Sequence, residues 1–359
     1  MFVWTVRRHT FQKLLLCLLL ALCAAALLLW PEAAANGVRR GLSICASVII
    51  PSLFPFLVLA GFLVHSGIAA GIGRRLSGPT RVLFGLPGCC AAGILIGFVG
   101  GYPAGAAAVG ELVRGGYITR EQGRRMLRFC VGGGPAFVLS AVGAGMLGNQ
   151  TYGLLLLAAQ WAAMLLIGIV GRFLDRDGSA QPPPPPAAAP AASAALVQSV
   201  GTACQSLLTM CGFVLLGATV LSLWDASGLP EGLTLWISCL TEVSCGCLEA
   251  SATGPLAPLL LGMTMGWGGL SVHGQIAANL QGLRLIDSGF FLARAAQAGI
   301  AGLFSMLLFR FVPVTVSAFA PDAGVLVQPF ATSSAVGGAS LLFLCALYLL
   351  TLKSRPKSG

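Results

Sequence analysis

The sequence predicts an all-α, polytopic membrane helical bundle that contains discontinuous or re-entrant helices. Of its 359 residues, 57% are hydrophobic and 9% are charged, whereas a soluble domain carries about 25% charged residues. Uncharged stretches long enough to cross a bilayer, which takes roughly 20 apolar residues, recur along the chain. Several of them hold glycine and proline near their centres, and both residues weaken or interrupt a helix.

The charges and cysteines indicate a membrane partner and no cofactor. The formal net charge of +10 arises largely from basic residues between the apolar stretches, where they set topology and meet anionic lipid. We therefore expect the lipid bilayer as partner and no nucleic acid, while the oligomeric state stays open. Most of the 12 cysteines lie in apolar stretches, and no His flanks the close pairs Cys89-Cys90 and Cys245-Gly246-Cys247. We expect these thiols to act as small hydrophobes, with no metal site.

Residues 1–40 are predicted to form an N-terminal membrane span. Basic residues precede an apolar run over Leu14–Trp30, a layout that a signal peptide shares. A retained span is the favoured interpretation, because further apolar stretches follow throughout the chain. The positive-inside rule then places the N terminus in the cytoplasm.

The first membrane half is predicted over residues 41–177, and two prolines interrupt its first stretch. Pro51 and Pro55 each remove a backbone donor, which predicts a kinked or re-entrant helix. His65 lies near the end of this stretch, and we expect it at the membrane interface rather than in a catalytic site.

The central feature of the first half is Gly97–Gly105, inside an uncharged run over 82–110. A membrane tolerates broken backbone only where protein or a water-filled cavity covers the freed polar groups. The segment is therefore predicted to be a discontinuous helix that faces the protein interior, with Gly101, Tyr102 and Pro103 as candidate substrate-binding residues. The alternative is a close helix–helix contact through small residues.

The remainder of the first half holds a basic segment and two further interruptions. Five arginines between Arg114 and Arg128 predict the cytoplasmic face, and a topology anchor is favoured over a ligand site. Gly132-Gly133-Gly134-Pro135 predicts another break, and Gly148-Asn149 predicts a turn.

Residues 178–195 are predicted to be an extended linker between the two halves. The segment contains Pro182–Pro186 and many alanines, so it offers little surface to bury. A plain spacer is favoured over a Pro-rich partner motif, and residues 182–195 are expected to be exposed.

The second membrane half is predicted over residues 196–312, with spans over Leu207–Leu223, Leu233–Leu248 and Phe290–Phe309. A second glycine break, Gly266–His273, lies before the last of these spans. Residues 313–359 are expected to hold a final span, 336–352, and a basic cytoplasmic tail.

The two glycine breaks can be superposed at a constant offset, which predicts two repeats. The offset places Gly101 on Gly269, and it places Thr119 on Asp287 as predicted helix N-caps. Matching interrupted segments in two halves indicate a transporter-like site near the middle of the membrane. We predict that the breaks approach each other there, and the candidate substrate-binding residues then also include Gly269, Ser271 and His273.

Charged residues inside apolar stretches complete the candidate substrate-binding set. Glu242 lies in an otherwise uncharged stretch, Glu249 follows seven residues later, and Arg294 lies within a predicted span. An ionisable group at membrane depth costs about 2.5–3.5 kcal/mol on insertion scales and usually faces a partner or water. We predict that Glu242 faces the interior and that Arg294 neutralises Glu242 or Glu249. The alternative is that Arg294 reaches the interface and Glu242 caps a short helix.

Five motifs carry a family resemblance over roughly residues 40–310: Pro51–Phe56, Gly100–Ala106, Ile118-Thr119 with Glu121, Gly268–His273 and Phe291–Arg294. In their order and spacing the chain resembles the YlbJ family of sporulation integral membrane proteins, within the nucleoside-recognition, or Gate, domain group. The resemblance implies two Gate-like repeats, a spore-forming bacterial source and a role in building the spore, with the cortex as the expected structure. It implies no particular substrate.

Two functions follow as expectations for a multi-pass protein of the bacterial cell membrane. The first is a transporter-like protein that takes an unknown small solute or ion between the repeats. The second is a structural or assembly protein of the spore membranes that transports nothing. We expect no enzyme, because the sequence shows no metal-ligand cluster, activated serine or phosphate loop.

Overall fold

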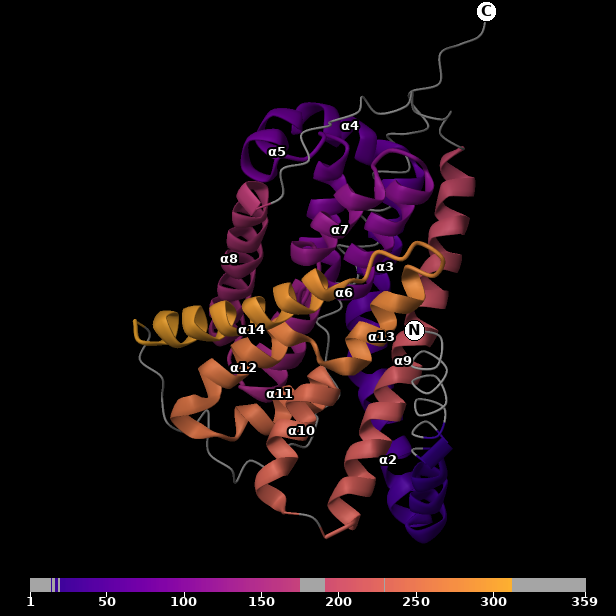
Figure 1. The fold of residues 1–359 in the computed structure, drawn as a ribbon, viewed down its shortest axis with the longest axis vertical. Coiled ribbons are helices and arrows are strands. Elements are labelled where there is room, and N and C mark those ends of the chain that lie inside the picture. The colour runs from indigo at the N-terminus through magenta and orange to yellow at the C-terminus, as the bar shows by residue number, and fades with distance from the viewer. Residues whose placement is uncertain (1–13, 15–16, 19, 175–190, 229, 312–359) are drawn as a thin grey trace, which may run out of the picture.

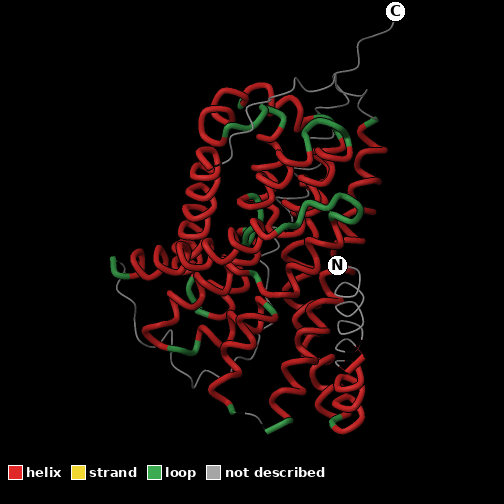
Figure 2. Tube along the Cα trace, viewed as in Figure 1, coloured by secondary structure: helices red, strands yellow, loops and turns green. Residues whose placement is uncertain are grey.

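The computed structural model describes residues 14, 17–18, 20–174, 191–228 and 230–311, which form helices and loops without a strand (Figure 2). Five helical segments in these ranges are long and apolar enough to cross a membrane: Cys90–Arg114, Gln150–Leu174, Ala192–Ala226, Gly254–Asn279 and Ser288–Phe309. The predicted all-α, polytopic membrane bundle is therefore confirmed. The final span predicted over 336–352 and most of the predicted linker lie outside the described residues.

Residues 31–65 form a long helical rod, and the helix before it meets it at a sharp bend. A helix over Leu20–Leu29 bends by 97° into the next helix. That helix, α2 (Pro31–Ile44), continues through the π-helix η1 (Cys45–Ile49) into α3 (Ile50–His65). The wider π-helical turn lies immediately before Pro51, which has no N–H to donate. The interruption expected at the prolines is thus a π-helical segment in a continuing helix, and not a re-entrant turn.

α9 (Ala192–Ala226) lies antiparallel to this rod (Figure 1). A Cβ on Gly37 would lie 2.6 Å from Thr219 Cα, and one on Gly61 would lie 3.2 Å from Ser199 Cβ. Small residues therefore let the two backbones approach closely. The end of the predicted linker is wrong, because Ala192–Ala195 form the first turn of α9 and Ala195 is fully buried. Alanine favours helix strongly once a packing partner is present.

α6 (Cys90–Arg114) is a hairpin rather than a straight rod. Gly101 leaves the helical conformation with φ 82° and ψ −169°, and a Cβ on Gly105 would lie 3.0 Å from Gly97 Cα. The outer ends also meet, since Cys89 Sγ lies 3.6 Å from the Tyr117 carbonyl oxygen. A straight helix of this length would separate its ends by more than roughly 35 Å, at 1.5 Å per residue. The segment is re-entrant, with its tip at Gly101.

A second hairpin is formed by α10 (Thr234–Thr241) and α11 (Val243–Ser251), with Glu242 at its tip. A Cβ on Gly246 would lie 2.7 Å from Cys239 Cα, so the two arms lie side by side. The single span predicted over Leu233–Leu248 is therefore wrong. Glu242 forms the turn in an extended conformation, with φ −143° and ψ 125°. The apolar composition of the stretch did not indicate this turn.

Two further helices are interrupted at glycine. A loop over 130–135 separates α7 (Arg120–Phe129) from the π-helix η2 (Ala136–Met146). Gly268, with φ 86°, separates α12 (Ala257–Trp267) from α13 (Gly269–Asn279). Figure 1 shows α12 and α13 extending to opposite sides of this break. The constant offset in the sequence therefore superposed a hairpin tip on a junction between successive helices, which are not equivalent elements.

Several local predictions are confirmed by the helix ends. The Gln122 N–H donates to Thr119 Oγ1 over 3.2 Å at the start of α7, and the Phe290 N–H donates to Asp287 Oδ1 over 2.8 Å at the start of α14 (Ser288–Phe309). The turn predicted at Gly148 has φ 63° and leads into α8 (Gln150–Leu174).

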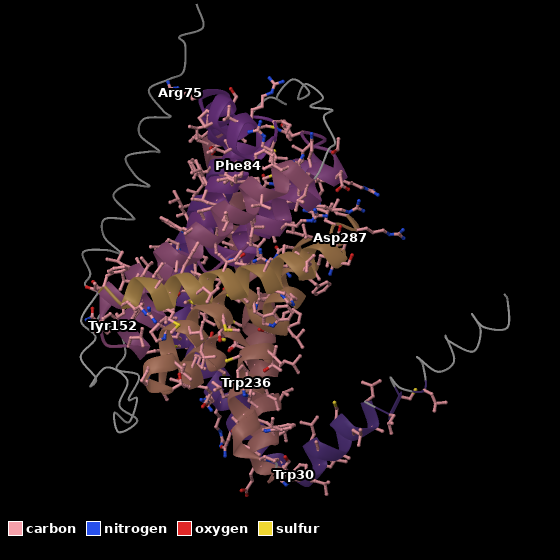
Figure 3. The ribbon with its side chains drawn as sticks, turned by 60° about the vertical axis from the view of Figure 1, so that its left-hand side comes forward. Trp30, Arg75, Phe84, Tyr152, Trp236 and Asp287 are labelled. Atoms are coloured by element: carbon pink, nitrogen blue, oxygen red, sulfur yellow. The ribbon has the colours of Figure 1, made fainter. Side chains whose placement is uncertain are left out.

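Figure 3 shows that α14 runs from Asp287 toward Tyr152. The ring centroid of Tyr152 lies 5.4 Å from that of Phe309, near the end of α14. Short helices complete the described fold: α4 (Ile68–Arg75), α5 (Ser77–Phe84), η3 (Glu231–Leu233) and η4 (Gly254–Leu256).

Candidate functional site

The four helix interruptions converge inside the bundle. A Cβ on Gly101 would lie 3.1 Å from Gly134 N, and one on Gly269 would lie 3.0 Å from Glu242 N. A Cβ on Gly268 would lie 3.4 Å from Tyr102 Cε1. Gly101, Gly268 and Gly269 all have positive φ, and only glycine combines that conformation with such close backbone approach. The predicted approach of the two glycine breaks is confirmed.

A small cavity of about 40 Å³ lies at this convergence. Its lining includes Gly101, Tyr102 and Pro103 from the α6 tip, Gly134 from the loop after α7, and Glu242 from the second tip. A space of this size accommodates about one water-sized species. The cavity therefore brings together three residues of the first predicted break with one of the predicted buried charges.

Glu242 is fully buried at the tip of its hairpin. Its Oε2 accepts a hydrogen bond of 2.7 Å from the Cys245 N–H, so the carboxyl group caps the N terminus of α11. Its Oε1 is buried and has no hydrogen-bond partner among the described residues. The predicted inward orientation of Glu242 is confirmed, and the alternative that it caps a short helix is correct as well. The site thus holds one acceptor oxygen that a ligand could use.

Arg294 does not pair with either carboxylate, so that prediction is wrong. The side chain is 1% exposed, and its guanidinium group donates to the carbonyl of Val131 and, over 2.6 Å, to the carbonyl of Arg128. The Val131 carbonyl would bond residue 135 in a continuing helix, but Pro135 has no N–H. Arg294 therefore satisfies acceptors that the break after α7 leaves free.

The same solution recurs at the other interruptions, where a side chain from another element donates to a freed carbonyl. The Tyr102 hydroxyl donates to the Met265 carbonyl at the break after α12. Trp161 Nε1 donates to the Phe98 carbonyl at the first tip, and Trp267 Nε1 donates to the Leu240 carbonyl at the second, each over 3.2 Å. Unsatisfied backbone groups are costly in an apolar environment. These donors let four interrupted helices persist inside the bundle.

The remaining predicted residues lie beside the cavity rather than in its lining. Ser271 and His273 are buried on α13; His273 Nε2 lies 3.2 Å from the Trp267 carbonyl oxygen, and its ring packs edge-to-face on Trp267 with centroids 4.5 Å apart. Gly269 packs directly against the backbone of Glu242, where a Cβ would lie 3.0 Å from Glu242 N. Glu249 lies half-buried at the far end of α11, so the structure does not bring it to Glu242.

Sequence reasoning missed several polar residues at and near the site. Ser244 and Gln275 line the cavity. Behind it, Gln297 Nε2 donates to Gln160 Oε1 over 3.2 Å, and Gln160 Nε2 donates to the Gly262 carbonyl over 2.9 Å. The signal that could have found the three glutamines was an amide side chain within a mainly apolar stretch. In the described ranges, no group of three His, Cys, Asp or Glu side chains is arranged to hold a metal ion.

A second cavity, of about 220 Å³, lies along α6, and no residue lines both cavities. Ala104, next to the cavity-lining Pro103, forms part of its wall, and the other end is polar, with His65, Glu111 and Arg114. Arg114 donates to Glu111 Oε1 over 3.0 Å and to the Asn279 carbonyl over 2.7 Å. The second cavity thus extends from the neighbourhood of the hairpin tip toward the basic end of α6.

Comparison with known proteins agrees with the family resemblance of the motifs. The chain is 27% identical over 320 residues to sporulation integral membrane protein YlbJ of Bacillus subtilis (strain 168), with 78% of each chain covered. No protein-family model and no solved structure matches the chain. With its long apolar helices, the chain is a multi-pass bacterial membrane protein similar to sporulation integral membrane protein YlbJ.

Proposed function

We propose that this protein acts in sporulation, in the formation of the spore cortex, as a transporter-like membrane protein that binds a small solute or ion at Glu242. The sporulation role rests on the similarity to YlbJ. The observation that supports a binding site is Glu242 itself. It is a fully buried carboxyl group with an unpartnered oxygen, and it lines a cavity where four helix interruptions meet.

The size of the cavity favours a small occupant in this conformation. Sites for drug-sized ligands measure roughly 300–1,000 Å³, whereas this cavity measures about 40 Å³. A carboxyl oxygen beside it suits a proton, a small cation or a hydrogen-bond donor. A larger solute would require the hairpin tips to move away from the breaks that they pack against, where Gly101 meets Gly134 and Glu242 meets Gly269.

The second cavity supplies the direction of access. It reaches from the wall beside Pro103 to the side that carries Glu111 and Arg114. On this side Arg114 forms an exposed ion pair with Glu111 and donates to the Asn279 carbonyl. Exposed ion pairs contribute little stability, so the ion pair would oppose entry only weakly.

Flux measurements in proteoliposomes test the proposal. The full-length protein is reconstituted, and proton and sodium fluxes are followed with a pH-sensitive dye and a sodium-sensitive dye. Glu242→Gln should reduce the flux at least tenfold, because the amide keeps the shape but loses the charge. Glu249→Gln is the matched control on the same helix and should leave the flux unchanged. Wild-type fluxes no higher than those of empty liposomes would remove proton and sodium transport from the proposal.

The second candidate function, a non-transporting assembly protein, is distinguished by complementation. The gene is expressed in a Bacillus subtilis strain that lacks YlbJ, and heat-resistant spores are counted. A transporter-like role predicts that Glu242→Gln abolishes rescue while the protein stays in the membrane. Full rescue by Glu242→Gln would favour the assembly function, for which the fold alone suffices.

A further inference from the structure

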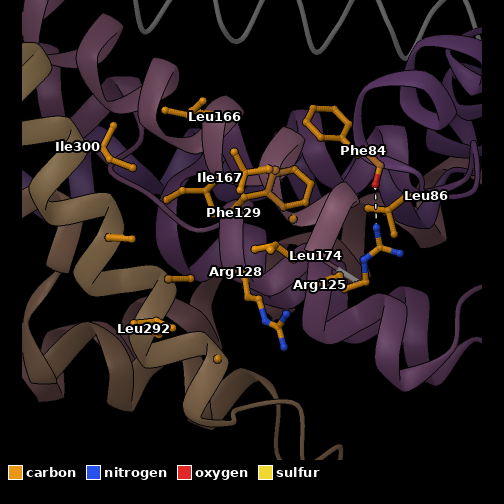
Figure 4. Close-up of a pocket in the computed structure, with 16 residues that line it drawn as sticks. Phe84, Leu86, Arg125, Arg128, Phe129, Leu166, Ile167, Leu174, Leu292 and Ile300 are labelled. Atoms are coloured by element: carbon orange, nitrogen blue, oxygen red, sulfur yellow. Dashed lines mark hydrogen bonds between the residues drawn. The ribbon is translucent and has the colours of Figure 1, made fainter. Parts of the chain in front are cut away.

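A separate apolar groove lies between α5, α7, α8 and α14 (Figure 4), and none of its residues lines the Glu242 cavity. Its volume is about 360 Å³, and its walls are mainly aliphatic and aromatic side chains, among them Phe84, Phe129, Leu166 and Ile300. The two arginines that line it are already engaged: Arg125 donates to the Phe84 carbonyl over 3.0 Å, and Arg128 Nη2 lies 3.4 Å from Asp287 Oδ2. The groove therefore suits an apolar occupant that brings no charge.

The groove is continuous with an uncovered face of α14. Residues spaced three and four apart lie on one side of a helix, and the groove holds the start of such a series: Gly289, Ala293, Ala296 and Ile300. The series continues beyond the groove with Leu303 and Leu307, which the described part of the chain leaves 63% and 50% exposed. We call these six residues the α14 face. In a membrane, such an apolar face is covered by lipid or by another helix.

The chain contains an apolar stretch that suits this face. The final span predicted over 336–352 lies outside the described residues and is long enough to cross a bilayer, which takes about 17–25 residues. α14 begins on the arginine-rich side, where Asp287 meets Arg128, and it ends at Phe309 beside Tyr152. A span that follows α14 returns in the opposite direction. It then brings three basic residues back to the arginine-rich side, as the positive-inside rule requires: Lys353, Arg355 and Lys357.

Side-chain size runs in opposite order along the two stretches. The α14 face begins with small residues from Gly289 to Ala296 and ends with Leu303 and Leu307. Residues 336–340 read Val-Gly-Gly-Ala-Ser, whereas residues 341–352 are rich in leucine. In an antiparallel pair, small residues therefore meet bulky ones at both ends, which lets membrane helices approach closely. A parallel pair would oppose leucine to leucine at one end and leave the groove unfilled at the other.

We propose that residues 336–352 pack antiparallel to α14 on the α14 face, with their leucine-rich part in the groove. The connection over 312–335 reaches at most about 80 Å, at 3.3 Å per residue, whereas α14 is only about 33 Å long, at 1.5 Å per residue. The connection is therefore long enough for this return. Because the segment belongs to the same chain, its effective concentration at the groove exceeds that of a free partner. A lipid chain would fill the groove but would not account for the reversed order of side-chain size.

The antiparallel arrangement gives a cross-linking test in the full-length protein. With Lys353 at the level of Ser288, Ala296 faces Cys345, because each lies eight residues from that level. Ala296→Cys should therefore cross-link to the native Cys345 through a short bismaleimide, and mass spectrometry of the linked peptides identifies the pair. Cys345→Ser should abolish this link.

Ala295→Cys is the matched control for the cross-link. Ala295 is also exposed but does not line the groove, since consecutive residues are turned by about 100° around a helix. Its cysteine should not link to Cys345. Equal linkage from positions 295 and 296 would show that residues 336–352 move freely beside α14, and it would overturn the proposal.

A photo-crosslinking amino acid identifies the occupant in membrane vesicles without dependence on the register. Placed at Ala296, it should attach to a peptide within 341–352 of the same chain, and placed at Leu303, to a peptide within 336–340. Attachment of a phospholipid mass at both positions would assign the groove to the bilayer. A link between two chains would assign the α14 face to a dimer. Either of these results would overturn the proposal.

Discussion

Arg294 donates to two carbonyls that the break after α7 leaves without helical partners. Arg294→Gln should destabilise the protein by roughly 1–3 kcal/mol for each acceptor left unsatisfied. Arg294→Lys should recover only part of this, because an ammonium group lacks the planar fork that reaches two acceptors. Thermal unfolding of the detergent-solubilised variants measures the difference.

A double-mutant cycle separates this carbonyl-capping role from the ion pair expected from the sequence. Glu242 and Arg294 share no contact among the described interactions, so the effects of Glu242→Gln and Arg294→Gln should add within about 0.5 kcal/mol. A coupling energy well above that value would contradict the assignment of Arg294 to the backbone carbonyls.

At the scale of the element, the α6 hairpin depends on Gly101. The residue has φ 82°, a conformation that strains any residue with a Cβ by roughly 1–3 kcal/mol, and the added Cβ would lie 3.1 Å from Gly134 N. Gly101→Ala should therefore lower the melting temperature. Gly116→Ala is the matched control, because Gly116 has φ 70° but open space around it. A smaller loss for Gly116→Ala measures the close approach at the tip, whereas equal losses would show that backbone strain alone explains the effect.

The hairpin also decides the topology of the whole molecule. Because α6 folds back, Cys89 and Tyr117 lie on the same side of the membrane, and the neighbouring arginines predict that this side is cytoplasmic. A hydrogen bond from the Cys90 thiol lowers the pKa of Cys89 to about 7. In inside-out vesicles, an impermeant maleimide should label Cys89 increasingly as the pH rises through 7, because the thiolate is the reactive form.

Two variants complete the topology test. Cys89→Ser should remove the pH-dependent part of the labelling, and Tyr117→Cys in that background should restore labelling from the same side. Labelling of residues 89 and 117 from opposite sides would contradict the re-entrant hairpin and support a straight crossing helix.

The sequence by itself determined the features that depend on local chemistry. Composition indicates a membrane bundle because uncharged apolar runs must leave water. Thr119 and Asp287 cap their helices because short polar side chains bond backbone N–H groups within three residues. Glycine and proline in one apolar run predict the break at Gly101. Because the hydrocarbon core holds no water, the backbone groups that the break frees must be covered by protein.

Only the tertiary structure decided where the chain goes after each break and which side chains donate to the carbonyls that the break leaves free. A glycine permits both a fold-back, as at Gly101, and a junction between successive helices, as at Gly268. The donors for the freed carbonyls come from distant positions: Tyr102 bonds Met265, and Arg294 bonds Val131, each 163 residues away in the chain. A local sequence pattern indicates that a backbone carbonyl loses its helical partner. Which side chain donates to that carbonyl instead depends on which helices the fold brings together.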